Sequence, residues 1–232
     1  MAHFDLALLW SGSYHDWLLA GLALSLQLTA ISLMFALPLA MAVALARLSP
    51  SRALNWLGVA FVEAIRNVPL LAQMLFWYFG APEMLPTAWK EHLYAGNIEA
   101  ISAVVALSLY TAAYMAEDMR SGIRGIPQQQ FEAGRALGFG FLATMRLFIL
   151  PQALRITVPP LLSQTLNLWK NTSIATVIGV AELMYQAQRV ETASFRSVEA
   201  FLFATACYLA VSLVISALAA LYYHRFPLRT LS

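Results

Sequence analysis

Few side chains in this chain of 232 residues have a type and spacing that could do chemistry. None of the four histidines has a neighbour at the spacing of metal ligands; they are His3, His15, His92 and His224. Both lysines, Lys90 and Lys170, follow a tryptophan, so the Gly-Lys-Ser/Thr of an ATP-binding phosphate loop is missing. No acids, bases or metal ligands gather at one depth, as an enzyme requires. We therefore expect no metal site, no cofactor and no catalysis on this chain.

Composition shows what the chain has in place of reactive groups. Hydrophobic residues make up 60% of it and charged residues 11%, whereas a soluble domain has roughly 45–50% and about 25%. Such a chain cannot cover a core with charged side chains, so lipid is its natural solvent. The net charge of +2 is too small to indicate nucleic-acid binding, and the single Cys207 has no partner within the chain.

Five apolar runs are long enough to cross a bilayer. A hydrocarbon core of roughly 30 Å takes about 20 mostly apolar residues in a helix. The runs are residues 17–46, 54–80, 99–119, 151–170 and 200–223. Pro38 is tolerated in the first run with a kink, and Pro151 suits the first turn of the fourth. The expected fold is an all-α integral membrane protein with about five transmembrane helices.

The distribution of Lys and Arg predicts the orientation of these spans. Nine of the fourteen basic residues fall on one side of the membrane: Arg47, Arg52, Arg120, Arg124, Arg135, Arg146, Arg155, Arg225 and Arg229. Because basic residues collect in the cytoplasm, the loop 120–150 and the tail 225–232 are expected there, and residues 1–16 outside. The first eight residues carry Asp5 and no Lys or Arg, so we expect no cleavable signal peptide.

The loop 120–150 has the pattern of a protein contact rather than of a passive connector. Pro127 can open a helix over residues 128–137, and Gly138 suits a left-handed C-terminal cap. This helix combines small residues, which let another surface approach the backbone, with apolar anchors: Ala133, Gly134 and Ala136, and Phe131 and Leu137. A second helical stripe leads toward the fourth span: Phe141, Leu142, Met145, Phe148 and Ile149.

The same loop resembles the EAA loop of ABC importer permeases. That pattern is Glu-Ala-Ala, three residues, Gly, nine residues, Ile, any residue, Leu, Pro; here Glu132-Ala133-Gly134, Gly138 and Phe148-Ile149-Leu150-Pro151 stand at those positions. Gly134 and Phe148 depart from the pattern but keep its small and apolar character. The resemblance implies that residues 128–138 form a coupling helix that docks on a cytoplasmic ATPase. Glu132 either contacts that partner or only complements the helix dipole.

Four further segments resemble the polar amino-acid permeases of this class, in the same order and spacing: EAIRNVPLLAQ from Glu63, TAAYMAEDMRSGI from Thr111, LPQALRITVPPLLSQ from Leu150 and LWKNTSIATVIG from Leu168. The resemblance implies a type-1 ABC transmembrane domain over residues 17–224. Two stretches, from Phe61 and from Asn167, are most similar to glutamate/aspartate permeases. Related permeases carry glutamine, arginine or histidine, so these substrates stay open.

A polar set in the second and fourth spans is the candidate substrate path or gate: Glu63, Arg66, Asn67, Pro69, Gln73, Gln164, Asn167, Lys170, Thr172 and Ser173. Glu63 and Arg66 share one helix face and can neutralise each other. Alternatively Arg66, which is costly to expose to lipid, faces the path and attracts a substrate carboxylate. The helix is expected to break near Pro69, where freed backbone groups can line a cavity.

The family resemblance also implies a set of partners. Two permease chains, identical or merely similar, form the path in a bacterial inner membrane, two ATPase chains with ATP and Mg²⁺ drive transport, and an extracytoplasmic binding protein delivers the amino acid. An ion-coupled secondary carrier is the main alternative. Such a carrier usually has more spans, inverted repeats and buried carboxylates.

Overall fold

The structure, a computed structural model, describes residues 12–226, and within this range it is built of helices and their connections. The long helices are α1 Ser13–Leu48, α2 Arg52–Arg66, α5 Ile98–Arg124, α8 Leu150–Asn171 and α10 Ser197–Arg225. The shorter helices are α3 Leu70–Leu75, α4 Thr87–Tyr94, α6 Gln128–Ala136, α7 Phe141–Thr144 and α9 Leu183–Ser194. Two π-helical segments, Phe76–Gly80 and Met145–Ile149, and two 3₁₀ segments, Ala81–Met84 and Thr172–Ile178, extend α3, α7 and α8.

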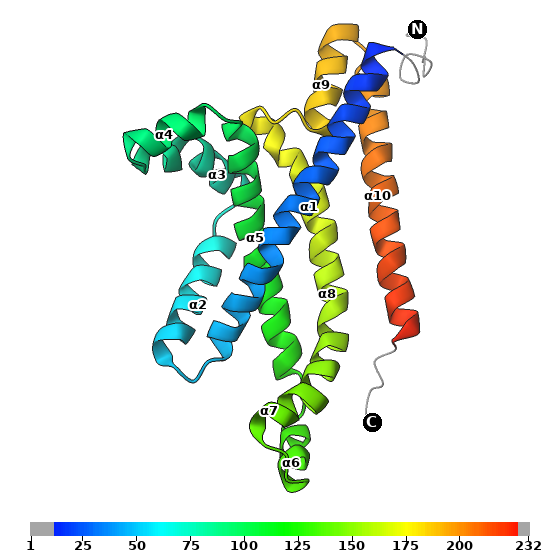
Figure 1. Cartoon of the computed structure of the whole chain (residues 1–232). Coiled ribbons are helices and arrows are strands. Elements are labelled where there is room, and N and C mark those ends of the chain that lie inside the picture. The colour runs from blue at the N-terminus through cyan, green and yellow to red at the C-terminus, as the bar shows by residue number, and fades with distance from the viewer. Residues whose placement is uncertain (1–11, 227–232) are drawn as a thin grey trace.

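Four long helices run roughly side by side along the molecule (Figure 1). Helices α1, α5, α8 and α10 cover the predicted runs 17–46, 99–119, 151–170 and 200–223. Ser13 at the start of α1 and Arg225 at the end of α10 lie at opposite ends of this bundle, as an odd number of crossings requires. Parts of residues 1–16 and 225–232 fall outside the described residues.

Only some of these helices are long and apolar enough to cross a membrane by themselves. Within residues 12–226 they are α1, α5 and α10, and α2 with residues 70–84 could give a fourth crossing as a bent pair. Helix α8 is long enough at about 33 Å, but it carries Arg155, Lys170 and several amides and hydroxyls along its length. The count of five spans therefore stays a prediction.

The second predicted span, 54–80, is not one continuous helix. Helix α2 ends at Arg66, and the chain bends by 99° before residues 70–84 continue. Pro69 has no backbone N–H and disfavours the helical conformation at Val68 before it. The expected break near Pro69 is confirmed, and it divides the run into two helices of different direction.

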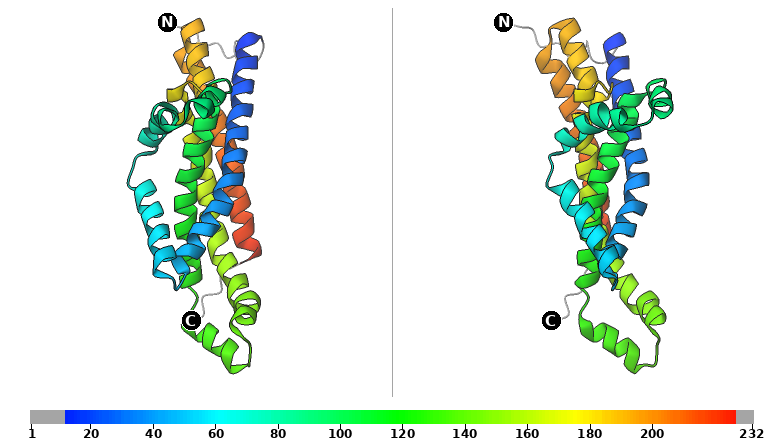
Figure 2. Two further views of the ribbon diagram at one scale, coloured as in Figure 1. Left: turned by 60° about the vertical axis from the view of Figure 1, so that its left-hand side comes forward. Right: turned by 90° about the vertical axis from the view of Figure 1, so that its left-hand side faces the viewer.

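Helices α1 and α5 pack against each other along two core clusters, and α8 packs beside α5 (Figure 2). Small residues permit the close approach. A Cβ on Gly21 of α1 would lie 2.9 Å from the Leu183 Cα of α9, and a Cβ on Gly122 of α5 would lie 2.2 Å from the Thr157 hydroxyl of α8. The hydrophobic effect does not drive helices together in lipid, so close packing of this kind holds them together.

A buried carboxylate joins the end of the bundle that carries α9. Glu182 is fully buried and accepts hydrogen bonds from the hydroxyls of Ser25 (3.1 Å), Tyr208 (2.8 Å) and Thr176, and from the backbone N–H of Tyr185 (2.9 Å). These donors belong to α1, α10, the 3₁₀ segment and α9. One side chain therefore connects four elements that are distant in sequence.

Candidate functional site

The helix predicted over residues 128–137 is present as α6, which protrudes with α7 beyond one end of the bundle (Figure 1). It begins after Pro127 and ends at Ala136, as the proline and glycine positions predict. Gly138 has φ +82°, its N–H donates to the Arg135 carbonyl (2.9 Å), and the Phe139 N–H donates to the Gly134 carbonyl (3.1 Å). This pair of bonds is a Schellman motif, which explains why a glycine stands at residue 138.

The predicted coupling residues divide between two faces of α6. Glu132, Ala133, Leu137 and Gly138 are exposed, and 69% of the surface of Leu137 is accessible to solvent. Phe131 is half-buried against a small cluster with Ile126, Ile149 and Ala153. Gly134 is buried against Thr144, the last residue of α7. Phe131 and Gly134 therefore attach α6 to its own chain, and the exposed residues form the face open to a partner.

The departure from the EAA pattern at Gly134 has a local cause. A Cβ at this position would lie 2.5 Å from Thr144 Cγ2 and 2.8 Å from its Oγ1. We expect Gly134→Ala to destabilise the contact between α6 and α7 by about 1–3 kcal/mol, as overpacking does. Hydrogen exchange of α6 amides in the purified protein measures the change. Thr144→Ala in the same chain removes both close atoms and is expected to restore protection.

Gly140→Ala is the matched control for this prediction, because its added Cβ would meet no atom within 4 Å. Protection of α6 should stay unchanged in that variant. Equal loss of protection in Gly134→Ala with and without Thr144→Ala would show that the contact does not explain the glycine.

A polar face runs along α5 and is completed by α2 and α8. Tyr110, Tyr114 and Asp118 are spaced by four residues and so share one side of α5. The Arg66 guanidinium lies 4.9 Å from the centre of the Tyr114 ring, and Gln164 of α8 donates to Asp118 (3.0 Å). We call these five residues the polar face. Membrane-facing surface rarely carries such side chains, so protein or water must cover it.

The structure brings some of the predicted path residues together here and separates others. Arg66 and Gln164 belong to the polar face, and Asn167 donates to Gln164 (3.4 Å) one turn further along α8. Glu63 does not pair with Arg66 among the described residues; it accepts a hydrogen bond from Asn67 (3.0 Å) instead. The expected neutralisation of Glu63 by Arg66 is therefore absent from this conformation.

Gln73 has a structural place at the helix break rather than an open one. Its side chain is buried, and its Nε2 donates to the carbonyls of Ile65 (2.8 Å) and Val68 (3.0 Å). Pro69 has no N–H to donate to the Ile65 carbonyl, and Val68 lies between the two helices, where its carbonyl belongs to neither helix. Gln73 thus satisfies the backbone groups that were expected to line a cavity.

The residues at the end of α8 cap that helix. Thr172 is fully buried and donates to the Trp169 carbonyl (2.8 Å), while Ser173 donates to the Lys170 carbonyl (2.8 Å). Lys170 is exposed. The following residues form a 3₁₀ segment, a turn at Gly179 with φ +87°, and α9. Thr172 and Ser173 stabilise the start of this turn.

Two parts of the site were not expected from the sequence. Tyr110 and Tyr114 lie inside an uncharged run, where only their spacing with Asp118 marks a polar stripe. Glu117 and Asp118 stand side by side near the end of α5 but have different partners. Glu117 forms ion pairs with Arg47 of α1 and with Arg120, whereas Asp118 accepts a hydrogen bond from Gln164.

Comparison with known proteins agrees with the geometry of this fold. The family described as binding-protein-dependent transport system inner membrane component matches residues 36–226. The chain is 38% identical to the probable glutamine ABC transporter permease protein GlnM of Bacillus subtilis, over 83% of this chain and 85% of GlnM. It is 32% identical to the glutamate/aspartate import permease protein GltJ of Escherichia coli K12, over 86% and 83% of the two chains.

A solved structure extends the likeness to three dimensions. The crystal structure of an amino acid ABC transporter with histidines superposes with a TM-score of 0.84 and 29% sequence identity, covering 97% of this chain and all of that one. The chain belongs to the family of binding-protein-dependent transport system inner membrane components, and it is a membrane permease of an ABC importer for amino acids.

Proposed function

We propose that this permease carries acidic amino acids, glutamate or aspartate, and that Arg66 binds a substrate carboxylate on the polar face. The exposed guanidinium is the observation that carries the proposal. Tyr114 holds it by a cation–π contact, which leaves its N–H donors available. A guanidinium binds carboxylates with two parallel hydrogen bonds. The printed names of the relatives include glutamine as well as glutamate/aspartate, so glutamine is the nearest alternative substrate.

Transport is driven by ATP hydrolysed on a separate ATPase, which docks on the exposed face of α6. The chain lacks a phosphate-binding loop of its own, and Leu137 offers an exposed apolar anchor at the protruding end of the molecule. A second permease chain faces the polar face, and a binding protein supplies the amino acid. Two different permease proteins of Escherichia coli CFT073, GltJ and GltK, carry the glutamate/aspartate name, which supports a paired arrangement.

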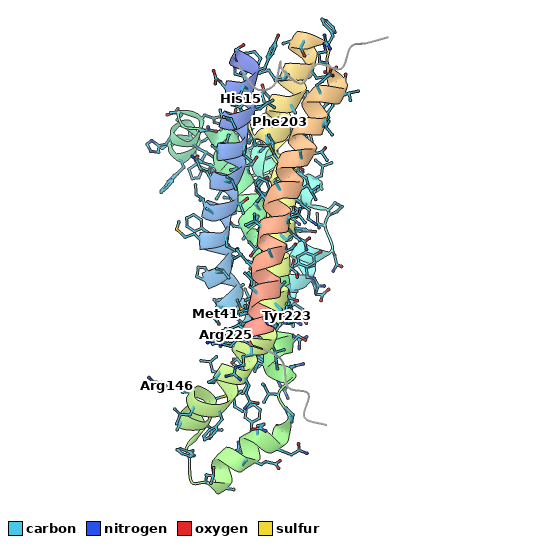
Figure 3. The ribbon with its side chains drawn as sticks, turned by 90° about the vertical axis from the view of Figure 1, so that its right-hand side faces the viewer. His15, Met41, Arg146, Phe203, Tyr223 and Arg225 are labelled. Carbon is cyan, nitrogen blue, oxygen red and sulfur yellow. The ribbon has the colours of Figure 1, made fainter. Side chains whose placement is uncertain are left out.

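The orientation follows from charge. Arg146 and Arg225 lie toward the end that carries α6, and His15 lies toward the opposite end (Figure 3). Tyr223 lies beside Arg225, where an interfacial aromatic belt is expected. The α6 end is accordingly cytoplasmic, with the start of α1 outside.

Arg66→Gln tests the substrate assignment. Loss of a charge-assisted hydrogen bond is worth about 1.5–3 kcal/mol, so uptake of glutamate is expected to fall about 10–100-fold. Glutamine uptake, where it occurs, should fall less, because it loses no second carboxylate contact. Radiolabelled uptake into vesicles that hold the permease, its ATPase and its binding protein measures both.

Arg155→Gln is the control, since Arg155 is exposed and nine residues, about two and a half turns, from Gln164 on α8. It therefore lies on the other side of that helix, and uptake should be unchanged. Equal losses for acidic and neutral substrates in Arg66→Gln would contradict the assignment. Uptake driven by a Na⁺ or proton gradient without the ATPase would instead favour a secondary carrier.

A further inference from the structure

Two apolar cavities lie side by side against α5. The first, of about 700 Å³, lies between α1 and α5, with Ile31 and Phe35 on one wall and Ile101 and Val105 on the other. The second, of about 440 Å³, lies between α5 and residues 76–93, and it shares Ile101 and Val105 with the first. We call the two cavities together the α5 groove.

The polar side chains in the wall of the α5 groove each form a hydrogen bond within the chain. The Ser108 hydroxyl donates to the Ser32 carbonyl (3.3 Å), and the Ser102 hydroxyl donates to the Trp77 carbonyl (3.1 Å). The Asn97 side-chain oxygen accepts from the Ala100 N–H (2.8 Å) as the cap of α5. The groove therefore presents hydrocarbon to whatever fills it, and its occupant must be apolar along its length.

The length of the groove matches one leaflet. Its lining on α5 runs from Asn97 to Leu109, a rise of about 18 Å. Half of a hydrocarbon core of roughly 30 Å is about 15 Å, the depth that an acyl chain of one leaflet reaches. A helix of a partner protein that crossed the membrane here would need a contact surface about twice as long.

The α5 groove also lies on the lipid side of the molecule. Ile101 and Tyr110 are nine residues apart on α5, about two and a half turns, so they face opposite ways. Another protein or water must cover the polar face that contains Tyr110. The α5 groove lies on the opposite side of the same helix and therefore faces lipid.

The end of the groove at Asn97 carries the side chains of a membrane interface. Helix α4 lies next to it and presents Trp89, which is 72% exposed, and Tyr94. Lys90 pairs with Glu83 on the same surface. Aromatic and basic side chains collect at head-group level. We propose that the α5 groove binds an acyl chain of one phospholipid whose head group lies at α4.

A photoreactive phospholipid tests this site. The full chain is placed in vesicles of phosphatidylethanolamine and phosphatidylglycerol with a trace of phosphatidylethanolamine that carries a diazirine in one acyl chain. After illumination, labelled peptides are mapped by mass spectrometry. Labelling of residues 31–39 and 97–109 is expected to exceed, several-fold, that of the exposed apolar residues Leu209 and Leu213 of α10, which meet only bulk lipid.

Two substitutions fill the groove from opposite walls. Ala100→Phe acts from α5 and Ile31→Trp from α1, and each is expected to reduce groove labelling several-fold while α10 labelling stays constant. If both substitutions reduce labelling of the groove to a similar extent, the cause is the filled groove rather than misfolding of one variant. Leu209→Phe on α10 is the matched control. Equal labelling of the groove and α10 would overturn the proposal. So would chain-to-chain adducts at the groove with little lipid, which would identify a protein interface.

Discussion

Gly138→Val is expected to uncouple uptake from ATP hydrolysis while leaving the protein in the membrane. Gly138 has φ +82°, and no atom lies within 4 Å of an added Cβ, so backbone strain rather than a clash opposes the substitution. A β-branched residue held in this conformation costs about 1–3 kcal/mol, which is enough to shift a two-state equilibrium about 5–150-fold. The cost falls on the Schellman motif that ends α6, and thus on the angle at which α6 would meet the proposed ATPase.

The measurement compares ATP hydrolysis and uptake in the same vesicles. The ATPase should continue to hydrolyse ATP in Gly138→Val, with uptake per ATP reduced about tenfold or more. Gly138→Asn should retain most uptake, because asparagine tolerates the left-handed region. Gly140→Val introduces the same side chain two residues away, at a glycine without positive φ, and is expected to be silent. Normal coupled uptake in Gly138→Val would show that the end of α6 is not part of the coupling.

Helix α6 could be predicted because its signals are local. Pro127 and Gly138 bound α6 through their own backbone preferences, which act wherever the chain is placed. The four long helices follow from apolar length in the same way. The break at Pro69 was also expected, because a proline restricts the residue before it whatever the tertiary context.

The roles of single polar residues could not be predicted from the sequence, since contacts across the fold decide them. Spacing alone suggested that Glu63 pairs with Arg66, but the bend of the chain brings Arg66 to Tyr114 of α5 instead. Gln73 was predicted to belong to the substrate path, but its side chain donates to two backbone carbonyls. The buried position of Glu182 could not be predicted either, because its partner Ser25 is 157 residues away in sequence.

Glu182→Ala is expected to destabilise the α9 end of the bundle more than any surface substitution. The change leaves the hydroxyls of Ser25, Thr176 and Tyr208 and the Tyr185 N–H without their acceptor. A buried donor left unpaired costs about 1–3 kcal/mol, and removal of the cap of α9 adds roughly 1 kcal/mol. Glu182→Gln should cost less than Glu182→Ala, because the amide keeps one acceptor oxygen. Some cost remains, because the two N–H donors of the amide replace the second oxygen and face hydroxyls that need an acceptor.

Hydrogen exchange in lipid vesicles distinguishes this local effect from global unfolding. Exchange should rise in residues 183–194 and in the adjoining starts of α1 and α10, while α6 and the middle of α5 stay protected. Glu91→Ala, which removes an exposed carboxylate of α4, is the matched control and should change nothing. Uniformly faster exchange along the chain would mean that Glu182 supports folding as a whole. Unchanged exchange near α9 would mean that helix packing, through contacts such as Gly21 against Leu183, holds this end without the carboxylate.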